Sequence, residues 1–259
     1  MIRQEGRLLL CAVQFLTRIP TPELRGFRSE WIQQSARYYS LVGQIVGSIA
    51  ALTLLGATHI WGAAIGALLA VGAGIALTGG FHEDGLADTA DGLGGGMTRA
   101  RRLEIMKDSR LGTYGALALM LTLALRVAAL ASITQVSPWL GTISLMASHG
   151  LGRAAAVGAM RIMPYGGDPG MAKEGKPDRA STSSLIVALL IALWPISLMP
   201  LHFGIGGILL GVLTGAVPAW QAFRLIGGRT GDILGAVEQS FELGFLLAIA
   251  GLAGLSSFS

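Results

Sequence analysis

The chain has 259 residues, of which 52% are hydrophobic and 13% are charged, and its formal net charge at pH 7 is +4. Soluble domains carry about 25% charged residues, so this composition excludes an ordinary water-soluble fold and indicates a polytopic membrane protein. The single cysteine, Cys11, excludes a disulfide framework and a cysteine-based metal site. A basic balance in a membrane protein reflects loops on the cytoplasmic side, so we expect a lipid bilayer and not nucleic acid as the partner.

The N-terminal segment contains a short apolar run. Residues 7–16 cannot span the hydrocarbon core, which needs about 20 residues. We therefore expect an interfacial helix with Arg3, Arg7 and Arg18 at the level of the lipid headgroups.

Seven apolar stretches follow, and each is expected to form a transmembrane helix. They cover residues 41–61, 62–80, 112–134, 138–160, 184–200, 204–222 and 241–258. Polar loops are expected at residues 81–111, 161–183 and 223–240. The sequence thus predicts an all-α, polytopic helical membrane bundle of about seven spans, forming one domain over residues 1–259.

Basic residues alternate between the connections. The N-terminal segment and the three polar loops hold all but two of the 19 Lys and Arg residues. Because basic loops remain inside, we expect the N-terminus and these loops in the cytoplasm. The two exceptions, Arg126 and Arg153, lie near the middle of predicted spans, so each must pair with an acid or an anion or line a polar cavity.

The densest group of acids lies in the segment GGFHEDGLADTADG at residues 79–92. On a helix, Asp84, Asp88 and Asp91 fall at positions i, i+4 and i+7, which share one face. Carboxylates at that spacing repel one another unless a cation lies among them, and oxygen ligands suit Mg²⁺ or Mn²⁺. Glu83 directly precedes them and is a further candidate ligand or a support for the others. The alternative is a solvated acidic first turn favoured by the helix dipole.

The first polar loop holds a second candidate segment, at residues 103–113. Glu104 and Asp108 are spaced for one helical face, and Lys107 and Arg110 could bind phosphate oxygens. The alternative is an amphipathic surface helix with internal ion pairs.

The third polar loop holds the turn GGRTGDILG at residues 227–235. Such a glycine-rich turn before a helix could present backbone N–H groups to phosphate, with Arg229 beside them. Asp232 is a candidate metal ligand or general base, and a plain connecting turn is the alternative. Acids and basic residues at one membrane face together favour chemistry on a phosphorylated or pyrophosphorylated substrate.

Read together, these segments resemble the cobalamin synthase family, the adenosylcobinamide-GDP ribazoletransferases. The matching segments are FLTRIPTP (15–22), LVG (41–43), GGFHEDGLADTADG (79–92), IMKDSRLGT (105–113), TGDILGA (230–236) and Glu242-Leu243. One departure is Ser40, where the family often has proline. The resemblance implies a Mg²⁺-dependent, multi-pass enzyme of the bacterial inner membrane. It would condense adenosylcobinamide-GDP with α-ribazole, or its 5′-phosphate, to give adenosylcobalamin, or its 5′-phosphate, and GMP.

The resemblance also implies roles for individual residues. A ribose hydroxyl of α-ribazole would attack the cobinamide-side phosphorus, and GMP would leave. The candidate metal ligands are Asp84, Asp88, Asp91 and Glu83. The candidate catalytic residues are Asp84, Asp88, Asp91, Asp108 and Asp232. The candidate substrate-binding residues are Lys107, Arg110, Arg126, Arg153 and Arg229.

Two other functions are alternatives for this sequence. A CDP-alcohol phosphotransferase acting on a lipid would need an Asp-Gly-x-x-Ala-Arg pattern, but here Asp84-Gly85-Leu86-Ala87 is followed by Asp88. A transporter would need acids at mid-membrane, whereas the acids fall in predicted loops. The sequence does not decide between α-ribazole and its phosphate, or between a monomer and a homo-oligomer.

Overall fold

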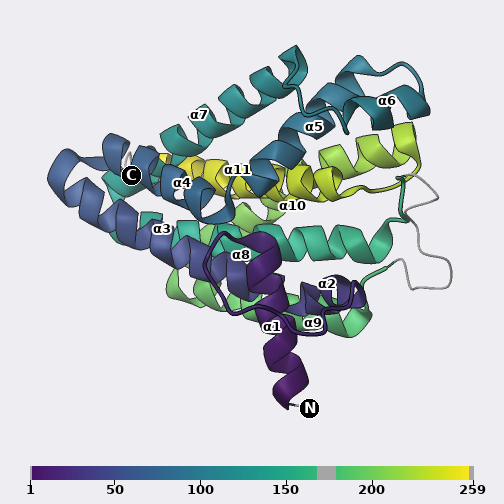
Figure 1. Ribbon diagram of the computed structural model, residues 1–259. Helices are drawn as coiled ribbons and strands as arrows, with labels where there is room; N and C mark the ends of the chain where they lie inside the picture. Colours follow the sequence, from purple (N-terminus) through teal and green to yellow (C-terminus); the bar gives the residue numbers. More distant parts are fainter. Residues whose placement is uncertain (1, 168–178, 257–259) are drawn as a thin grey trace.

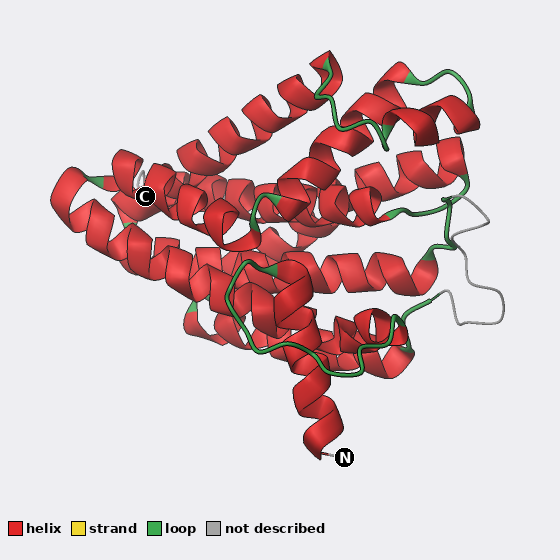
Figure 2. Ribbon diagram, in the orientation of Figure 1, coloured by secondary structure: helices red, strands yellow, loops and turns green. Residues whose placement is uncertain are grey.

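The computed structural model describes residues 2–167 and 179–256, and this part of the chain consists of helices without a named strand (Figure 1, Figure 2). In chain order they are α1 (Ile2–Leu16), α2 (Glu30–Gln34), η1 (Ser35–Tyr38), α3 (Tyr39–Trp61), α4 (Ala63–Thr78), α5 (Phe81–Gly95), α6 (Arg99–Ile105), α7 (Thr113–Val136), α8 (Pro138–Ile162), α9 (Thr182–Leu193), η3 (Trp194–Leu198), α10 (Leu201–Ile226) and α11 (Gly231–Ser256). The expected all-α class is confirmed.

Four helices in the described part of the chain are long and apolar enough to cross a bilayer. They are the stretch Glu30–Trp61, which ends in α3, and the helices α7, α10 and α11. Helices α4 and α5 pass the same test only as a pair bent by 90°. Leu52, Leu121 and Leu209 are among the large apolar side chains exposed on these helices, as a lipid environment favours. A helical membrane bundle is therefore confirmed, whereas the predicted seven spans are not: the described helices give four, or five with the bent pair.

Helix α8 lies in the middle of the bundle, with α3, α9 and α11 packed around it (Figure 1). Glycines make these contacts close. A Cβ added to Gly47 of α3 would lie 3.0 Å from the Cα of Met146, and one added to Gly152 of α8 would lie 3.2 Å from the carbonyl oxygen of Glu238. In lipid, where burial of apolar surface gives helices little reason to associate, this backbone-to-backbone packing holds them together.

A row of small residues joins α10 to α11. Gly207, Gly211 and Gly215 fall one turn apart on α10, and a Cβ at Gly211 would lie 3.0 Å from the ring of Phe241. The hydroxyl of Thr214 donates to the carbonyl oxygen of Ser240 at 2.8 Å. These contacts fix α11 between α10 and the helices α5, α7 and α8.

Gly79 and Gly80 form the bend between α4 and α5. Both have left-handed backbone conformations, with φ of 70° and 71°, which a residue with a side chain adopts only at a cost. The N–H of Gly80 donates to the carbonyl oxygen of Ile75 at 3.0 Å and so closes the end of α4. The chain therefore turns by 90° immediately before the acidic segment, and α5 crosses the direction of α4.

The structure differs from the predicted polar loops. The loop expected over residues 223–240 is wrong, because α10 continues to Ile226 and α11 begins at Gly231. Charged residues lower the hydropathy of this stretch, although one of them, Glu238, has its partner Arg153 inside the bundle. Residues 168–178, most of the second predicted polar loop, lie outside the described residues. The N-terminal helix is present as α1, and it runs across the direction of α3 and α8 (Figure 1).

Candidate active site

Helix α5 carries the predicted row of acids. Asp84 is exposed, Asp88 is half-buried and Asp91 is buried. With four acids in 15 residues, α5 is too polar to be a span, and it lies outside the four helices that qualify. Burial and the neighbouring charges of Asp84, Asp232 and Asp91 raise the pKa of Asp88 to about 7. Negative charge from two helices, α5 and α11, is therefore concentrated around Asp88.

Two glycines bring these helices into contact. A Cβ added to Gly85 of α5 would lie 2.9 Å from the carbonyl oxygen of Asp232 and 3.1 Å from its Cα. One added to Gly235 of α11 would lie 3.1 Å from the carbonyl oxygen of His82. Since backbone atoms cannot move aside as a side chain can, glycine is required on both helices for this approach. The crossing places Asp232 beside the aspartates of α5.

Asp232 lies in the first turn of α11, next to a capping residue. Thr230 precedes the helix, and its hydroxyl oxygen accepts a hydrogen bond from the N–H of Ile233 at 3.3 Å. The same hydroxyl donates to Oδ2 of Asp232 at 3.2 Å. The partial positive charge of a helix N-terminus favours a carboxylate here.

Asp91 has a different position from the other two aspartates of α5. Its Oδ2 accepts a hydrogen bond from the N–H of Gly112 and its Oδ1 accepts one from the N–H of Gly115, both at 2.8 Å. These are N–H groups at the start of α7, which the helix itself leaves without partners. Asp91 thus ties the end of α5 to the beginning of α7, with both oxygens already engaged.

The aspartates gather without forming a closed set of metal ligands. Within the described residues, one group of three His, Cys, Asp or Glu ligand atoms lies within 4.8 Å of one another, and it is a different one: His149, Glu238 and Glu242. Mg²⁺, however, commonly takes one or two carboxylates and completes its coordination with water and substrate phosphates. The charge concentrated around Asp88 fits that open type of site.

The segment after α6 differs from its prediction. The helix ends at Ile105, so Glu104 and Asp108 do not share a helical face. Glu104 pairs with Arg101 at 2.8 Å, as in the surface-helix alternative. Asp108 accepts hydrogen bonds from the guanidinium of Arg110, the shortest at 2.6 Å, and these bonds lower its pKa to about 2. Lys107 and Arg110 both lie on the surface.

Two arginines in this region have structural roles that the sequence does not predict. Arg99 donates from Nε to the carbonyl oxygen of Ile226 and from Nη2 to that of Gly166, each at 2.9 Å. Arg102 donates to the carbonyl oxygen of Leu225 at 3.3 Å. Both bind the free carbonyl groups at the end of α10, where basic side chains are favoured. No sequence signal distinguishes them from the other basic residues of the loop.

Arg229 is buried in the turn between α10 and α11. Its N–H donates to the carbonyl oxygen of Pro164 at 2.9 Å, and its carbonyl oxygen accepts from the N–H of Gly166 at 2.8 Å. The turn is therefore held by the segment that follows α8. The backbone N–H of Arg229 already has a partner, so it is not open to a phosphate.

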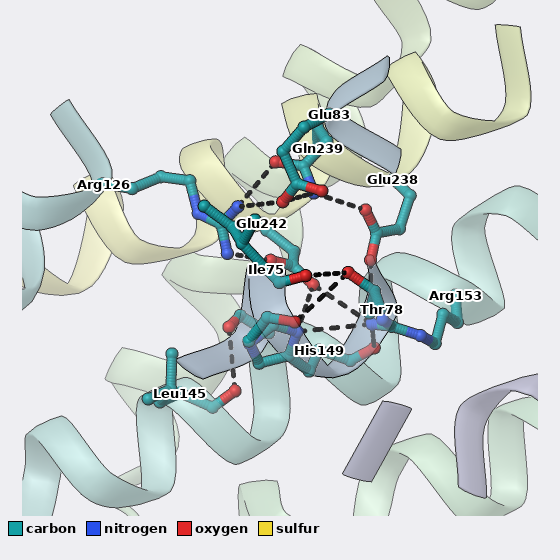
Figure 3. Close-up of polar contacts among 12 residues, drawn as sticks. Ile75, Thr78, Glu83, Arg126, Leu145, His149, Arg153, Glu238, Gln239 and Glu242 are labelled. Carbon is teal, nitrogen blue, oxygen red and sulfur yellow. Dashed lines mark hydrogen bonds and ion pairs between the residues drawn. The ribbon is translucent and has the colours of Figure 1, made fainter. Parts of the chain in front are cut away.

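The two arginines predicted within the membrane lie at the centre of a buried ionic network (Figure 3). Arg126 of α7 pairs with Glu242 of α11 and lies 3.7 Å from Glu83 of α5. Arg153 of α8 lies 2.8 Å from Glu238 and 3.3 Å from Glu242. The expectation that each arginine must find an acid is confirmed.

Neutral groups complete this network. Nδ1 of His149 lies 2.8 Å from Oε1 of Glu242, and the carbonyl oxygen of the same histidine accepts from Nη1 of Arg153 at 2.9 Å. Gln239 donates to Oε1 of Glu83 at 3.1 Å and to Oε2 of Glu238 at 3.0 Å. Side chains from α5, α7, α8 and α11 therefore meet at one point inside the bundle (Figure 3). The expectation that the acids lie in loops is wrong for Glu238, which belongs to α11, as does Glu242 of the predicted span 241–258.

This interior cluster has the geometry of an ion-pair network. The guanidinium of Arg153 already lies against Glu238 and Glu242, the carboxylates that would hold a cation. The adjoining cavity, lined by Glu83 and Arg126 among others, has a volume of about 10 Å³, room for a single water molecule. A substrate phosphate does not fit there. Glu83 faces this interior, away from the exposed Asp84 next to it.

The helices form an apolar bundle, and carboxylates of α5 and α11 lie together next to a basic polar segment. This combination defines an integral membrane enzyme. The chain belongs to the cobalamin-5-phosphate synthase family, whose sequence model matches residues 8–250.

Curated relatives cover nearly the whole chain. A protein of Leptothrix cholodnii named adenosylcobinamide-GDP ribazoletransferase is 42% identical over 247 residues, which are 92% of this chain and 93% of the relative. Proteins with the same name from Shewanella piezotolerans and Vibrio cholerae are 41% and 40% identical, over 93% and 94% of this chain and 93% of each relative. No solved structure matches the chain.

Proposed function

We propose that the protein is an adenosylcobinamide-GDP ribazoletransferase, which joins adenosylcobinamide-GDP to α-ribazole or its 5′-phosphate and releases GMP. The relatives with this name and the family match over residues 8–250 support the proposal. The structural observation that carries it is the meeting of Asp84 and Asp88 with Asp232 across the Gly85 contact. Two helices thus offer carboxylates to a reaction at a pyrophosphate.

Asp84 and Asp88 are the residues that would hold Mg²⁺. They are one turn apart on α5, and the negative charges of Asp84, Asp232 and Asp91, which together with burial raise the pKa of Asp88, support a cation at this position. Bound at this position, Mg²⁺ would neutralise charge on the pyrophosphate oxygens during the displacement. Asp91 and Glu83 are not among the proposed metal ligands. Asp91 caps α7, and Glu83 belongs to the interior network.

Asp232 is the proposed proton acceptor. It belongs to the other helix, so it approaches the reactants from a different side than Asp84 and Asp88 do. Deprotonation of the attacking ribose hydroxyl needs a carboxylate within hydrogen-bond reach, and Asp232 lies in the first turn of α11, beside the aspartates of α5. Asp108 is less suited, because Arg110 holds its pKa at about 2 and so makes it a weak base.

Lys107 and Arg110 are the proposed phosphate-binding residues. The Arg110–Asp108 pair is exposed, so exchanging the carboxylate for a substrate phosphate costs little. Arg126 and Arg153 pair with glutamates inside the bundle, and we assign them to holding α5, α7, α8 and α11 together. We place the protein in the bacterial inner membrane, with the segment that carries Lys107 and Arg110 in the cytoplasm, because basic segments of a membrane protein remain on that side.

The direct test is the reaction itself. The purified protein in lipid nanodiscs is incubated with adenosylcobinamide-GDP, α-ribazole and Mg²⁺, and the products are separated by chromatography. We expect equal amounts of GMP and adenosylcobalamin, and a parallel reaction with α-ribazole 5′-phosphate identifies the preferred acceptor. Asp84→Asn should remove the activity. Absence of GMP with both acceptors, from a protein with a cooperative thermal unfolding transition, would overturn the proposal.

A CDP-alcohol substrate is tested in the same assay. Formation of CMP from CDP-diacylglycerol, with no GMP from adenosylcobinamide-GDP, would favour the lipid phosphotransferase instead.

A further inference from the structure

An open groove with three arginines lies between α1 and the segment leading into α2, away from the aspartates. Its volume is about 460 Å³, and it is lined by Gln4, Arg7, Arg25, Gly26, Arg28 and Trp31. The guanidinium of Arg7 lies over the ring of Trp31, 5.9 Å from its centroid. No carboxylate is among the lining residues.

The nearby acid of α1 does not neutralise this groove. Glu5 pairs with Arg37 at 3.2 Å and accepts a hydrogen bond from the hydroxyl of Tyr38 at 2.8 Å. Both contacts draw its carboxylate toward η1. Arg25 and Arg28 are exposed, so the groove presents guanidinium groups to an incoming anion. Their planar N–H pairs match the oxygens of a phosphate.

The surroundings of the groove are those of a membrane interface. Helix α1 lies across the direction of the long helices (Figure 1), and it buries Leu8 and Leu16 against the rest of the protein. Phe27, between two of the arginines, is 52% exposed. Helix α9 packs against η1 and exposes Ile186 and Leu190, as expected of a surface that faces acyl chains. Basic residues next to an apolar, aromatic surface are typical of sites for anionic lipid headgroups.

We propose that this groove binds the phosphate headgroup of an anionic phospholipid, with Arg7, Arg25 and Arg28 around the phosphate and the acyl chains along the outer surface of the bundle. The occupant is a lipid because exposed apolar side chains, Phe27 beside the arginines and those of α9, are suited to acyl chains. Arg7 is eight residues from Phe15, about 12 Å along the helix. Phe15 in turn contacts Phe81, the first residue of α5, with ring centroids 5.3 Å apart.

A bound lipid would therefore act on the catalytic segment through α1. Besides the Phe15–Phe81 contact, the N–H of Arg18 donates to the carbonyl oxygen of Leu77 at 2.7 Å, just before the bend into α5. A lipid that holds α1 in the interface also holds the start of α5 in place.

Lipid binding is measured directly, without turnover. Protein in detergent is titrated with phosphatidylglycerol or with phosphatidylcholine of the same acyl chains, and bound lipid is counted by native mass spectrometry. We expect phosphatidylglycerol to bind at least about tenfold more tightly, with Arg25→Gln/Arg28→Gln removing most of that preference. Arg25→Lys/Arg28→Lys should retain much of it. The matched control is Arg224→Gln on α10, an arginine stacked on Trp220 outside the groove, which should change nothing.

Competition separates a lipid from a soluble anion. Inorganic phosphate and glycerol phosphate should displace phosphatidylglycerol only weakly, because they lack acyl chains. Equal retention of the two lipids, an unchanged preference in the Arg25→Gln/Arg28→Gln variant with an unaltered melting temperature, or displacement by millimolar phosphate would each overturn the proposal. None of these outcomes depends on whether the enzyme releases GMP.

Discussion

Gly85 of α5 lies directly against the backbone of Asp232 of α11: a Cβ at this glycine would come within 2.9 Å of the aspartate's carbonyl oxygen. The two residues belong to segments more than 140 positions apart in the chain. Their contact sets the separation between the proposed metal ligands and the proposed proton acceptor.

Gly85→Ala should therefore impair catalysis by separating α5 from α11. We expect kcat/KM for GMP release to fall roughly 100-fold, the loss typical of a misplacement of about 1 Å. The control is Gly56→Ala on α3, where nothing lies within 4 Å of the added Cβ. Unchanged activity in Gly85→Ala would show that the crossing does not position the site.

Substitution of single aspartates should separate their roles. Asp84→Asn should weaken Mg²⁺ binding, measured by calorimetry in nanodiscs, and abolish turnover. Asp232→Asn should abolish turnover and leave Mg²⁺ affinity nearly unchanged. Asp91→Asn should also leave the affinity unchanged and should lower the melting temperature, because Asp91 caps α7. A loss of Mg²⁺ affinity in Asp232→Asn would make that residue a ligand instead of the base.

Mg²⁺ binding should depend on pH through Asp88. Its raised pKa, about 7, means that below this pH a proton must leave before the carboxylate can bind a cation. The affinity should therefore fall up to tenfold for each pH unit below about 7 and level off above it. Without the cation, the raised pKa of Asp88 also makes the stability of the protein depend on pH. The stability that the protonated Asp88 contributes is fully present below the ordinary pKa of 3.8 and is lost as the pH rises through about 7. In Asp88→Asn the affinity should be weak at every pH, and a wild-type affinity independent of pH between 6 and 8 contradicts the assignment.

The interior network should control stability. Arg126→Met removes the guanidinium that pairs with Glu242 and lies beside Glu83, and removing one member of a buried pair costs about 3–5 kcal/mol. We expect a large drop in melting temperature, partly restored in Arg126→Met/Glu242→Gln, which removes one of the two negative charges that Arg126 faces. Arg101→Met, which breaks the exposed pair with Glu104, is the control and should change the unfolding free energy by less than about 1 kcal/mol. Equal effects of the two single substitutions would refute the network's role.

Local regularities of the sequence predicted much of α5 and its surroundings. Helical spacing placed Asp84 and Asp88 on neighbouring turns, and Gly79-Gly80 marked where the preceding helix ends. The cost of a charge in lipid predicted that Arg126 and Arg153 would pair with an acid or an anion or line a polar cavity, and both pair with acids. These conclusions depend either on a few neighbouring residues or on the free-energy cost of a charge in lipid.

The partners themselves could not be read from the sequence. Glu238 and Glu242 lower the hydropathy of their segment, and hydropathy counts a charge in the same way whether or not an arginine neutralises it. The sequence therefore predicts a loop where the first turns of α11 lie. The cap that Asp91 makes on α7 and the clamp that Arg99 makes on α10 depend on where two helix ends meet, and no local pattern records that.

The order in which the ribosome makes the chain gives the ionic network a further significance. Arg126 and Arg153 leave the ribosome with α7 and α8, well before Glu238 and Glu242 emerge on α11. During synthesis both arginines must enter the membrane region while their acids do not yet exist, with only Glu83 already made. The acids of α11 neutralise both arginines when this helix is inserted, so the nascent protein reaches its final packing only with its C-terminal helix. A chain that stalls before this helix would retain two unpaired cations in the membrane region.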